Sequence, residues 1–509
     1  MDIVLATFNA SYAHAAFGLR YLRANLGDLR DRSTIVELDA TIAPLDAVEA
    51  LLAYEPRVIG LGVYIWNATI TRAVVELLRV LRPGVKVVLG GPEVSHETDQ
   101  QAVCALADVV VIGEGDVAFR EVCAALLAGE AVDHVVRGGL PALPALVLPY
   151  SLYTDEDLAH RVIYVEASRG CPFLCAFCLS ALDKSVRRFD EDAFLSALAD
   201  LHDRGLRTYK FVDRTFNLSV ASCTRILRFF RDRLTPDLFV HFELVPDRLP
   251  SELKALIAAF PAGTLQFEIG IQTFDADVAA RIDRRHEPAH IDANLAWLRA
   301  NTGVHLHTDL IVGLPGESVA CFGAGFDRLH ALGPQEIQVG ILKRLRGAPI
   351  AKHTDTWGMV YSPRPPYEVL QTSVVTFAEM QAMKRFARFW ELVSNAGHYR
   401  HTLALLLDGG SPFARFSALA AFLSARFGRA HAIASGRLVE ALHAHALAIG
   451  LPEAAVARAL IDDLVRAGRT PIPDLLRPFA TDEERRLRKS RAPSAGDGHT
   501  RQAAHARVD

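Results

Sequence analysis

Short β-branched apolar runs that alternate with amphipathic stretches constrain the fold of this chain most strongly. Continuously apolar strands separated by helices indicate a parallel sheet that helices cover on both faces. We therefore expect residues 1–130 to form a doubly wound, Rossmann-like α/β domain, with ligands at the carboxyl ends of the strands. The expected strands are 2–8, 34–38, 58–65, 86–90 and 108–112, with helices at 15–25, 45–54, 70–81 and 117–128.

A second series of six strand–helix units begins after a connection rich in glycine and proline. Six units, where a complete barrel has eight, predict a partial (β/α)6 barrel of TIM type that is open on one side. Strands then disappear from about residue 351, and residues 369–470 carry Ala and Leu at helical spacing. The expected strands are 162–167, 208–213, 239–245, 264–271, 305–312 and 336–342. The expected division is a Rossmann-like domain at 1–135, a linker at 136–158, the barrel at 159–350, a helical domain at 351–480 and a disordered tail at 481–509.

Length and composition agree with several buried cores. The chain has 509 residues, half of them apolar and 22% charged, and a single core rarely exceeds about 250–300 residues. A net charge of −4 gives no overall electrostatic footprint for nucleic acid, and the basic stretch near 485–491 is expected to be a solvated terminus. No run approaches the roughly 18 apolar residues of a membrane span, and the N-terminus lacks a basic signal-peptide start. We expect a cytoplasmic protein without a membrane partner.

Three of the seven cysteines lie within eight residues, at Cys171, Cys175 and Cys178, directly after the first strand of the second series. Thiolates are the soft ligands that iron–sulfur clusters require. Three thiolates cannot saturate a cubane of four irons, so one iron stays open to an external chelating ligand. A structural zinc site would need a fourth protein ligand, which no neighbouring His or Cys supplies at a suitable spacing.

The aromatic Phe177 completes a match to the CxxxCxφC signature, and this region resembles the radical S-adenosylmethionine (SAM) superfamily. Segments 213–217, 268–272 and 309–317 match the superfamily in order, so the resemblance covers roughly residues 160–345. It implies that Cys171, Cys175 and Cys178 ligate a catalytic [4Fe-4S] cluster and that SAM chelates the open iron.

Inward-pointing polar groups at strand ends can accept hydrogen bonds from the ribose hydroxyls or the methionine ammonium of SAM. The same groups could instead form structural salt bridges inside the barrel, and Asp213 could equally face the substrate. The expected SAM contacts are Phe177, Asp213, Glu243, Glu268 and Gln272.

A Rossmann-like domain ahead of such a barrel resembles the cobalamin (B12)-binding radical SAM class. The matches are the glycine turns after the fourth and fifth strands, because glycine lets the backbone approach a broad planar ligand. The expected cobalamin contacts are Tyr12, Tyr64, Trp66, Gly90, Gly91, Pro92, Glu93, Glu114 and Gly115.

Several alternatives for this domain stay open or are excluded. The D-x-H-x-x-G motif that supplies a cobalt ligand in B12 methyltransferases is absent. His14 or Tyr12 could approach the corrin instead, although His14 and His96 could equally be ordinary polar residues. Without the motif, the domain could also be vestigial and bind nothing. The first turn lacks G-x-G-x-x-G, which argues against a nicotinamide site. A methylthiotransferase would carry three cysteines here, whereas only Cys104 and Cys123 occur, both expected in the core.

Residues 357–363 and 366–370 resemble the helical extension of one branch of these proteins, a domain of unknown function labelled DUF4080.

The combined cofactors suit methylation of an unactivated carbon. A radical cyclisation or rearrangement without methyl transfer is the alternative, and a cofactor-storage protein is a weaker one. We expect an external one-electron donor of flavodoxin or ferredoxin type and a small-molecule or peptide substrate, with no nucleic acid partner. Lys343, Arg344 and Arg346 could bind an anionic substrate, the SAM carboxylate or only water.

Overall fold

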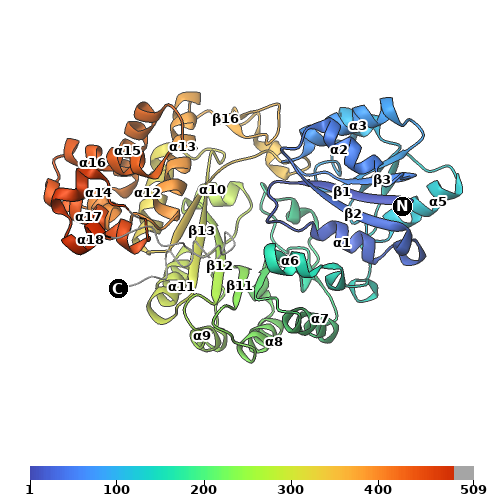
Figure 1. The fold of residues 1–509 in the computed structure, drawn as a ribbon, viewed down its shortest axis with the longest axis horizontal. Helices are drawn as coiled ribbons and strands as arrows, with labels where there is room; N and C mark the ends of the chain where they lie inside the picture. The colour runs from blue at the N-terminus through green and yellow to red at the C-terminus, as the bar shows by residue number, and fades with distance from the viewer. Residues whose placement is uncertain (470, 487–509) are drawn as a thin grey trace.

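The two strand series form two separate parallel sheets, followed by a group of helices (Figure 1). The computed structural model describes residues 1–469 and 471–486. In Figure 1 the N-terminal domain (blue) and the C-terminal helices (red) lie at opposite ends, with the second sheet (green to yellow) between them. Within the described residues, no helix is both long and apolar enough to cross a membrane.

The N-terminal sheet has the strand order β2-β1-β3-β4-β5-β6, and all its strands are parallel. Every residue of β1 is buried because helices cover both faces, which confirms the predicted doubly wound domain. A sixth strand was not expected, since two of its three residues, 136 and 137, fall inside the segment interpreted as a linker. The strands are β1 (Ile3–Asn9), β2 (Ser33–Asp39), β3 (Val58–Gly62), β4 (Lys86–Gly90), β5 (Val109–Ile112) and β6 (Val135–Arg137).

Two hydrophobic clusters show which helices cover which face. Helices α2 (Pro44–Leu52), α3 (Ala68–Leu81) and α4 (Ala102–Leu106) pack on one face, whereas α1 (Phe17–Ala24) and α5 (Ala118–Ala128) pack on the other. Cys104 and Cys123 are buried in these two clusters, as predicted. Burial raises the pKa of Cys104 to about 11 and that of Cys123 to about 12, so both thiols stay protonated.

The second sheet has the order β14-β13-β12-β11-β10-β7, again all parallel. Strands β7 and β14 are its two edges, so the predicted barrel is partial and open, as expected. Its strands are β7 (Ile163–Val165), β10 (Thr208–Phe211), β11 (Phe239–Leu244), β12 (Leu265–Gln272), β13 (His305–Val312) and β14 (Glu336–Ile341). Its helices are α7 (Glu191–Asp203), α8 (Val220–Arg231), α9 (Ser251–Ala258), α10 (Ala276–Arg281), α11 (Pro288–Asn301) and α12 (Val319–Ala331).

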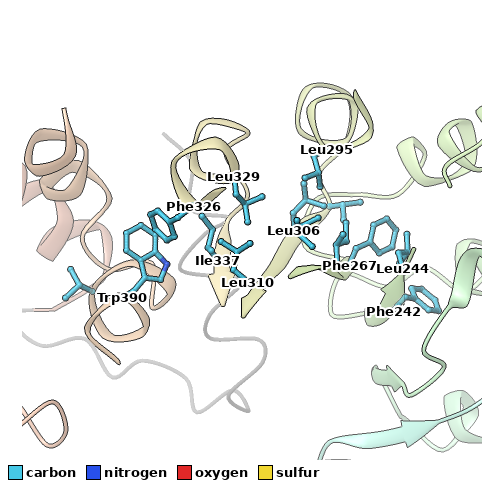
Figure 2. Close-up of a cluster of buried hydrophobic side chains, with 14 of the residues drawn as sticks. Phe242, Leu244, Phe267, Leu295, Leu306, Leu310, Phe326, Leu329, Ile337 and Trp390 are labelled. Carbon is cyan, nitrogen blue, oxygen red and sulfur yellow. The ribbon is translucent and has the colours of Figure 1, made fainter. Parts of the chain in front are cut away.

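The barrel core continues without a break into the C-terminal helices (Figure 2). Phe326 of α12 meets Trp390 of α13 (Phe377–Trp390) edge to face, with ring centroids 4.8 Å apart. Such aromatic pairs stabilise a contact beyond the area they bury. The C-terminal helices are therefore part of the same core as the barrel and are not an independent unit. The remaining helices are α6 (Asp155–His160), α14 (Arg400–Leu407), α15 (Pro412–Phe427), α16 (Ser435–Ala448), α17 (Glu453–Arg466) and α18 (Asp482–Arg486).

A buried carboxylate organises the helical region. Asp463 of α17 is fully buried and accepts hydrogen bonds from His401 N–H (3.0 Å), Thr402 N–H (2.9 Å) and the Thr402 hydroxyl (2.8 Å). These N–H groups belong to the first turn of α14, where no intrahelical acceptor exists. Asp463 therefore caps α14 from another helix.

Two expectations for the C-terminal part need correction. Strands do not end at residue 351, because β15 (Val360–Tyr361) and β16 (Val369–Gln371) form an antiparallel hairpin. Strands of two and three residues are too short to give a period-2 pattern. Part of the expected disordered tail is the helix α18, and the rest, residues 487–509, lies outside the described residues.

Candidate functional site

The cysteine loop lies between the short strands β8 (Ser168–Arg169) and β9 (Arg187–Arg188), which pair antiparallel. Ala176, in the middle of the loop, donates its N–H to Ile282 O (2.8 Å) and accepts one from Ile350 N–H (2.7 Å). Backbone contacts on both sides thus fix the loop between the turn after α10 and the segment after β14.

All three cysteines line one cavity of about 240 Å³ at the carboxyl ends of the barrel strands. Of the predicted SAM contacts, Phe177, Glu243, Glu268 and Gln272 also line it. Among the described residues, no three His, Cys, Asp or Glu side chains are grouped to hold a single metal ion. The thiols instead share a cavity, and a cubane cluster takes each thiolate on a different iron.

Asp213 does not lie on this cavity, in contrast to its prediction as a SAM contact. Its carboxylate is buried and accepts hydrogen bonds from Ala167 N–H (3.0 Å) and the Ser168 hydroxyl (2.6 Å). Burial raises the pKa of Asp213 to about 6. The side chain anchors the start of β8 and so positions the cysteine loop from behind.

The pKa values of two carboxylates in the cavity are shifted in opposite directions. Glu243 and Glu268 are register partners on β11 and β12. Burial raises the pKa of Glu243 to about 7, although Arg214 donates to it at 2.9 Å. Burial acts on Glu268 as well, but the hydrogen bond with His241 Nε2 (3.0 Å) and the nearby charges of His241, His307 and Lys210 together outweigh it and lower the pKa to about 2. At neutral pH Glu268 is therefore a carboxylate, suited to a cationic ligand group.

The cavity also contains polar groups that the sequence did not single out. Arg214, Arg284 and Asp309 line it, and Arg284 Nη1 donates to Cys175 Sγ at 3.4 Å. Arg284 comes from the turn after α10, where the charged run 283–286 was the only available signal.

Gln272 shows that the cavity fits a polar ligand. Its backbone is left-handed (φ 72°) at a register shift in β12, and its Oε1 is buried without a hydrogen-bond partner among the described residues. A buried acceptor of this kind needs a donor, and a bound ligand hydroxyl or ammonium would supply one.

A second cavity, of about 300 Å³, lies in the N-terminal domain between β3–β5 and the helices α1 and α5. Seven of its lining residues are glycines, namely Gly18, Gly60, Gly62, Gly90, Gly91, Gly113 and Gly115. At Gly91 (φ +107°) an added Cβ would lie 2.6 Å from Val63 O, so only glycine fits. A cavity walled by backbone and apolar side chains suits a bulky, mainly apolar group.

The structure divides the predicted cobalamin contacts. Tyr64, Gly90, Gly91, Glu114 and Gly115 line the second cavity, whereas Tyr12, Trp66, Pro92 and Glu93 do not.

The residues off the cavity have other partners. The Trp66 ring, 51% exposed, stacks on Tyr64 with centroids 4.5 Å apart. The Tyr12 hydroxyl donates to Glu156 (3.0 Å), and Pro92 is exposed. His14 Nδ1 lies 2.6 Å from the Tyr164 hydroxyl of the barrel.

Glu93 is buried and pairs with the barrel. Its Oε1 accepts from Arg346 Nε (3.0 Å) and from the Tyr367 hydroxyl (2.6 Å). Arg344 and Arg346 both pair with Glu97 (2.9 Å each). These two arginines therefore pair with carboxylates of the N-terminal domain, a partner that differs from the three considered from the sequence, namely an anionic substrate, the SAM carboxylate and water.

Arg169 links the barrel to the N-terminal domain. Its guanidinium donates to Glu166 (2.9 Å), Glu114 (3.0 Å) and Asp116 (2.8 Å), and it lines the N-terminal cavity two residues before Cys171. Arg169 follows β7 and Arg346 follows β14, the two edges of the barrel sheet, while their carboxylate partners follow β4 and β5. The carboxyl ends of the two sheets consequently face each other.

Three domain families match consecutive parts of the chain. The B12 binding domain matches residues 3–123, the Radical SAM superfamily matches 165–327, and the Protein of unknown function DUF4080 matches 355–492. The chain is thus a radical SAM protein with an N-terminal B12-binding domain and a DUF4080 region, as the sequence predicted. The radical SAM domain implies SAM and a [4Fe-4S] cluster, and the B12-binding domain implies cobalamin.

Curated relatives are similar over part of their length. The 2-(S-pantetheinyl)-carbapenam-3-carboxylate methyltransferase of Streptantibioticus cattleyicolor is 28% identical over 60% of this chain and 50% of its own. The cobalamin-dependent radical SAM methyltransferase TokK of Streptomyces tokunonensis is 27% identical over 62% of this chain and 51% of its own. The chain thus spans about half the length of these relatives.

Solved structures share the fold. The radical SAM methyltransferase TsrM from Kitasatospora setae has a TM-score of 0.57 at 16% identity, covering 79% of this chain and 90% of that one. The cobalamin-dependent SAM radical enzyme OxsB has a TM-score of 0.61 at 12% identity, covering 94% and 83%. At these identities the similarity concerns the arrangement of the chain alone.

Proposed function

We propose that this protein is a cobalamin-dependent radical SAM enzyme that methylates an unactivated carbon of a small metabolite or a peptide. The observation that carries the proposal is a pair of cavities at the facing carboxyl ends of the two sheets: three thiols line one and glycines line the other, which Arg169 also lines. Methyl transfer is supported by the names of the two curated relatives.

A separate set of residues would hold each cofactor. Cys171, Cys175 and Cys178 would hold the cluster, and Glu268 with Gln272 would bind the polar groups of SAM. The glycine-walled cavity would take part of the cobalamin, with Tyr64, Gly90, Gly91, Glu114 and Gly115 in contact. When bound, the cluster and SAM supply a 5′-deoxyadenosyl radical, and cobalamin supplies the methyl group.

The N-terminal domain would also shield the reaction from water. Its β4 and β5 loops contact the segments after both edge strands of the barrel, through Arg346 and Arg169. No described strand of the partial barrel closes the gap between its edge strands β7 and β14, so the docked N-terminal domain completes the enclosure. Excluding water protects radical intermediates from side reactions.

The substrate proposal rests on the site rather than on a basic surface. The arginines after β14 are occupied by Glu93 and Glu97, which leaves no cluster of free cations there for a polyanion. One curated relative is named for a small carboxylate metabolite. We therefore favour a small molecule or peptide, with an external flavodoxin- or ferredoxin-type electron donor.

The test is anaerobic incubation of the reconstituted protein with SAM, a reductant and extract from its own host, followed by mass spectrometry. Methylation predicts a product heavier by about 14 Da, together with S-adenosylhomocysteine and 5′-deoxyadenosine. Formation of 5′-deoxyadenosine alone, with a product of altered connectivity, would favour cyclisation or rearrangement. Absence of both nucleoside products in cluster-loaded protein would contradict the proposal.

A further inference from the structure

The segment from Lys343 to Gln371 contacts both cofactor loops. Its first part, residues 343–354, lies between the radical SAM match, which ends at residue 327, and the DUF4080 match, which begins at residue 355. We name it the bridging segment. It starts after β14, includes β15, and ends with β16. Its contacts fall into two groups, one with the B12-binding domain and one with the cysteine loop.

Toward the B12-binding domain, the bridging segment binds the loop after β4. Arg346 donates from Nε to Glu93 (3.0 Å) and from Nη1 to Glu97 (2.9 Å). The Tyr367 hydroxyl donates to the same Glu93 oxygen at 2.6 Å and accepts from Arg346 Nη2 at 3.1 Å. Charge-assisted hydrogen bonds in a buried position are among the stronger polar contacts of proteins.

The backbone at this contact adopts left-handed conformations at three positions. Glu97 (φ 50°) and Tyr367 (φ 55°) both adopt the left-handed conformation, which is unfavourable for residues with a Cβ. Gly347 (φ +78°) lies so close to the His96 ring that an added Cβ would be 2.3 Å from it. Three unusual positions at one contact indicate that the surrounding bonds impose this geometry.

Toward the cluster, the bridging segment binds the cysteine loop and the turn beside it. Ile350 N–H donates to Ala176 O (2.7 Å) between the second and third cysteines. Lys352 Nζ pairs with Asp283 (2.6 Å), and Trp357 lies under the Arg281 guanidinium, 4.5 Å from the ring centroid. The segment thus holds the turn that carries Arg284 as well.

We infer that the bridging segment is a brace that sets the cobalamin-binding loop of residues 90–97 over the cluster loop, with Arg346 and Tyr367 as positioning residues. The inference rests on the proposed function, because holding the cobalamin-binding loop against the cluster loop matters only if both cofactors bind. It assigns a role to residues 355–371, where the DUF4080 match begins.

The first test follows hydrogen exchange in protein without cobalamin. Arg346→Gln should speed amide exchange in residues 91–101 by about tenfold, since it removes the donor shared by Glu93 and Glu97. Tyr367→Phe, which removes one hydroxyl, should give a smaller increase in the same peptide. Arg364→Gln is the matched control, because Arg364 lies on the same segment but is exposed.

The second test measures affinity for hydroxocobalamin by equilibrium dialysis, with iron content measured alongside. Arg346→Gln should raise the Kd by about tenfold, while Arg364→Gln leaves it unchanged and all three variants keep the wild-type iron content. Wild-type exchange or wild-type affinity in folded Arg346→Gln would overturn the inference. If the wild-type protein bound no cobalamin, the proposed function would fail instead, and the exchange data alone would decide whether Arg346 holds the loop.

Discussion

Gly18 offers a substitution whose effects on stability and on cobalamin binding should have opposite signs. It is the second residue of α1 and lines the N-terminal cavity. An added Cβ would have one neighbour within 4 Å, the Tyr64 hydroxyl at 3.4 Å, which is ordinary van der Waals contact. Gly18→Ala should therefore fit the protein without cobalamin and raise its unfolding free energy by about 0.4–1 kcal/mol.

The same methyl group would occupy space that the corrinoid needs. Overpacking of a close-fitting site costs about 1–3 kcal/mol, which corresponds to a Kd raised by about 5- to 150-fold. Equilibrium dialysis with hydroxocobalamin measures the Kd, and thermal or urea unfolding of the unloaded protein measures stability.

Gly436 provides the control, since it is the second residue of α16 and an added Cβ there meets nothing within 4 Å. Gly436→Ala should stabilise the protein to a similar extent and leave the Kd unchanged. Wild-type affinity in Gly18→Ala would refute the assignment of this cavity to cobalamin. Equal losses of affinity in both variants would point to a general effect of the substitutions.

Three further predictions concern stability. Asp463→Ala should lower the unfolding free energy by about 1–3 kcal/mol in urea titration because it uncaps α14. Asp462→Ala removes only an exposed ion pair and should lower it by less than about 1 kcal/mol. Equal losses in the two variants would contradict the role of Asp463 as a cap. Arg169→Met should cost about 3–5 kcal/mol, since it leaves buried carboxylates unpaired, and near-wild-type unfolding would show that the domains dock without it. Burial raises the pKa of Glu166 to about 7, so the folded state binds this proton more tightly and stability should fall as pH rises from about 4.5 to 7. The difference in unfolding free energy between wild type and Glu166→Gln should change across that window and be flat above it.

Much of the fold followed from the sequence because its signals are local. Runs such as 58–65 and 86–90 are apolar throughout, and each lies between helical patterns, so both parallel sheets were predictable. The strands that were missed have two or three residues each, and pairing with a neighbour rather than their own pattern makes them strands; they are β6, β8, β9, β15 and β16.

The candidate site was predictable where residue type and spacing determine chemistry, as for the three cysteines. Strand-end carboxylates were less certain, since a side chain there can turn either into the cavity, as Glu243 does, or behind the loop, as Asp213 does. Arg346 could not be assigned, because its partners Glu93 and Glu97 lie about 250 residues earlier in the chain. Only the folded structure brings such charges together.

The central claim is that Cys171, Cys175 and Cys178 together hold a [4Fe-4S] cluster, and iron analysis after anaerobic reconstitution tests it most directly. The wild-type protein should bind about four irons per chain, with the charge-transfer absorbance of a cluster that dithionite bleaches. The triple Cys→Ala variant should bind none, while Cys321→Ala, which changes a thiol outside the loop, should keep the full content. Iron retained by the triple variant, or a wild-type chain that takes up zinc alone, would contradict the account.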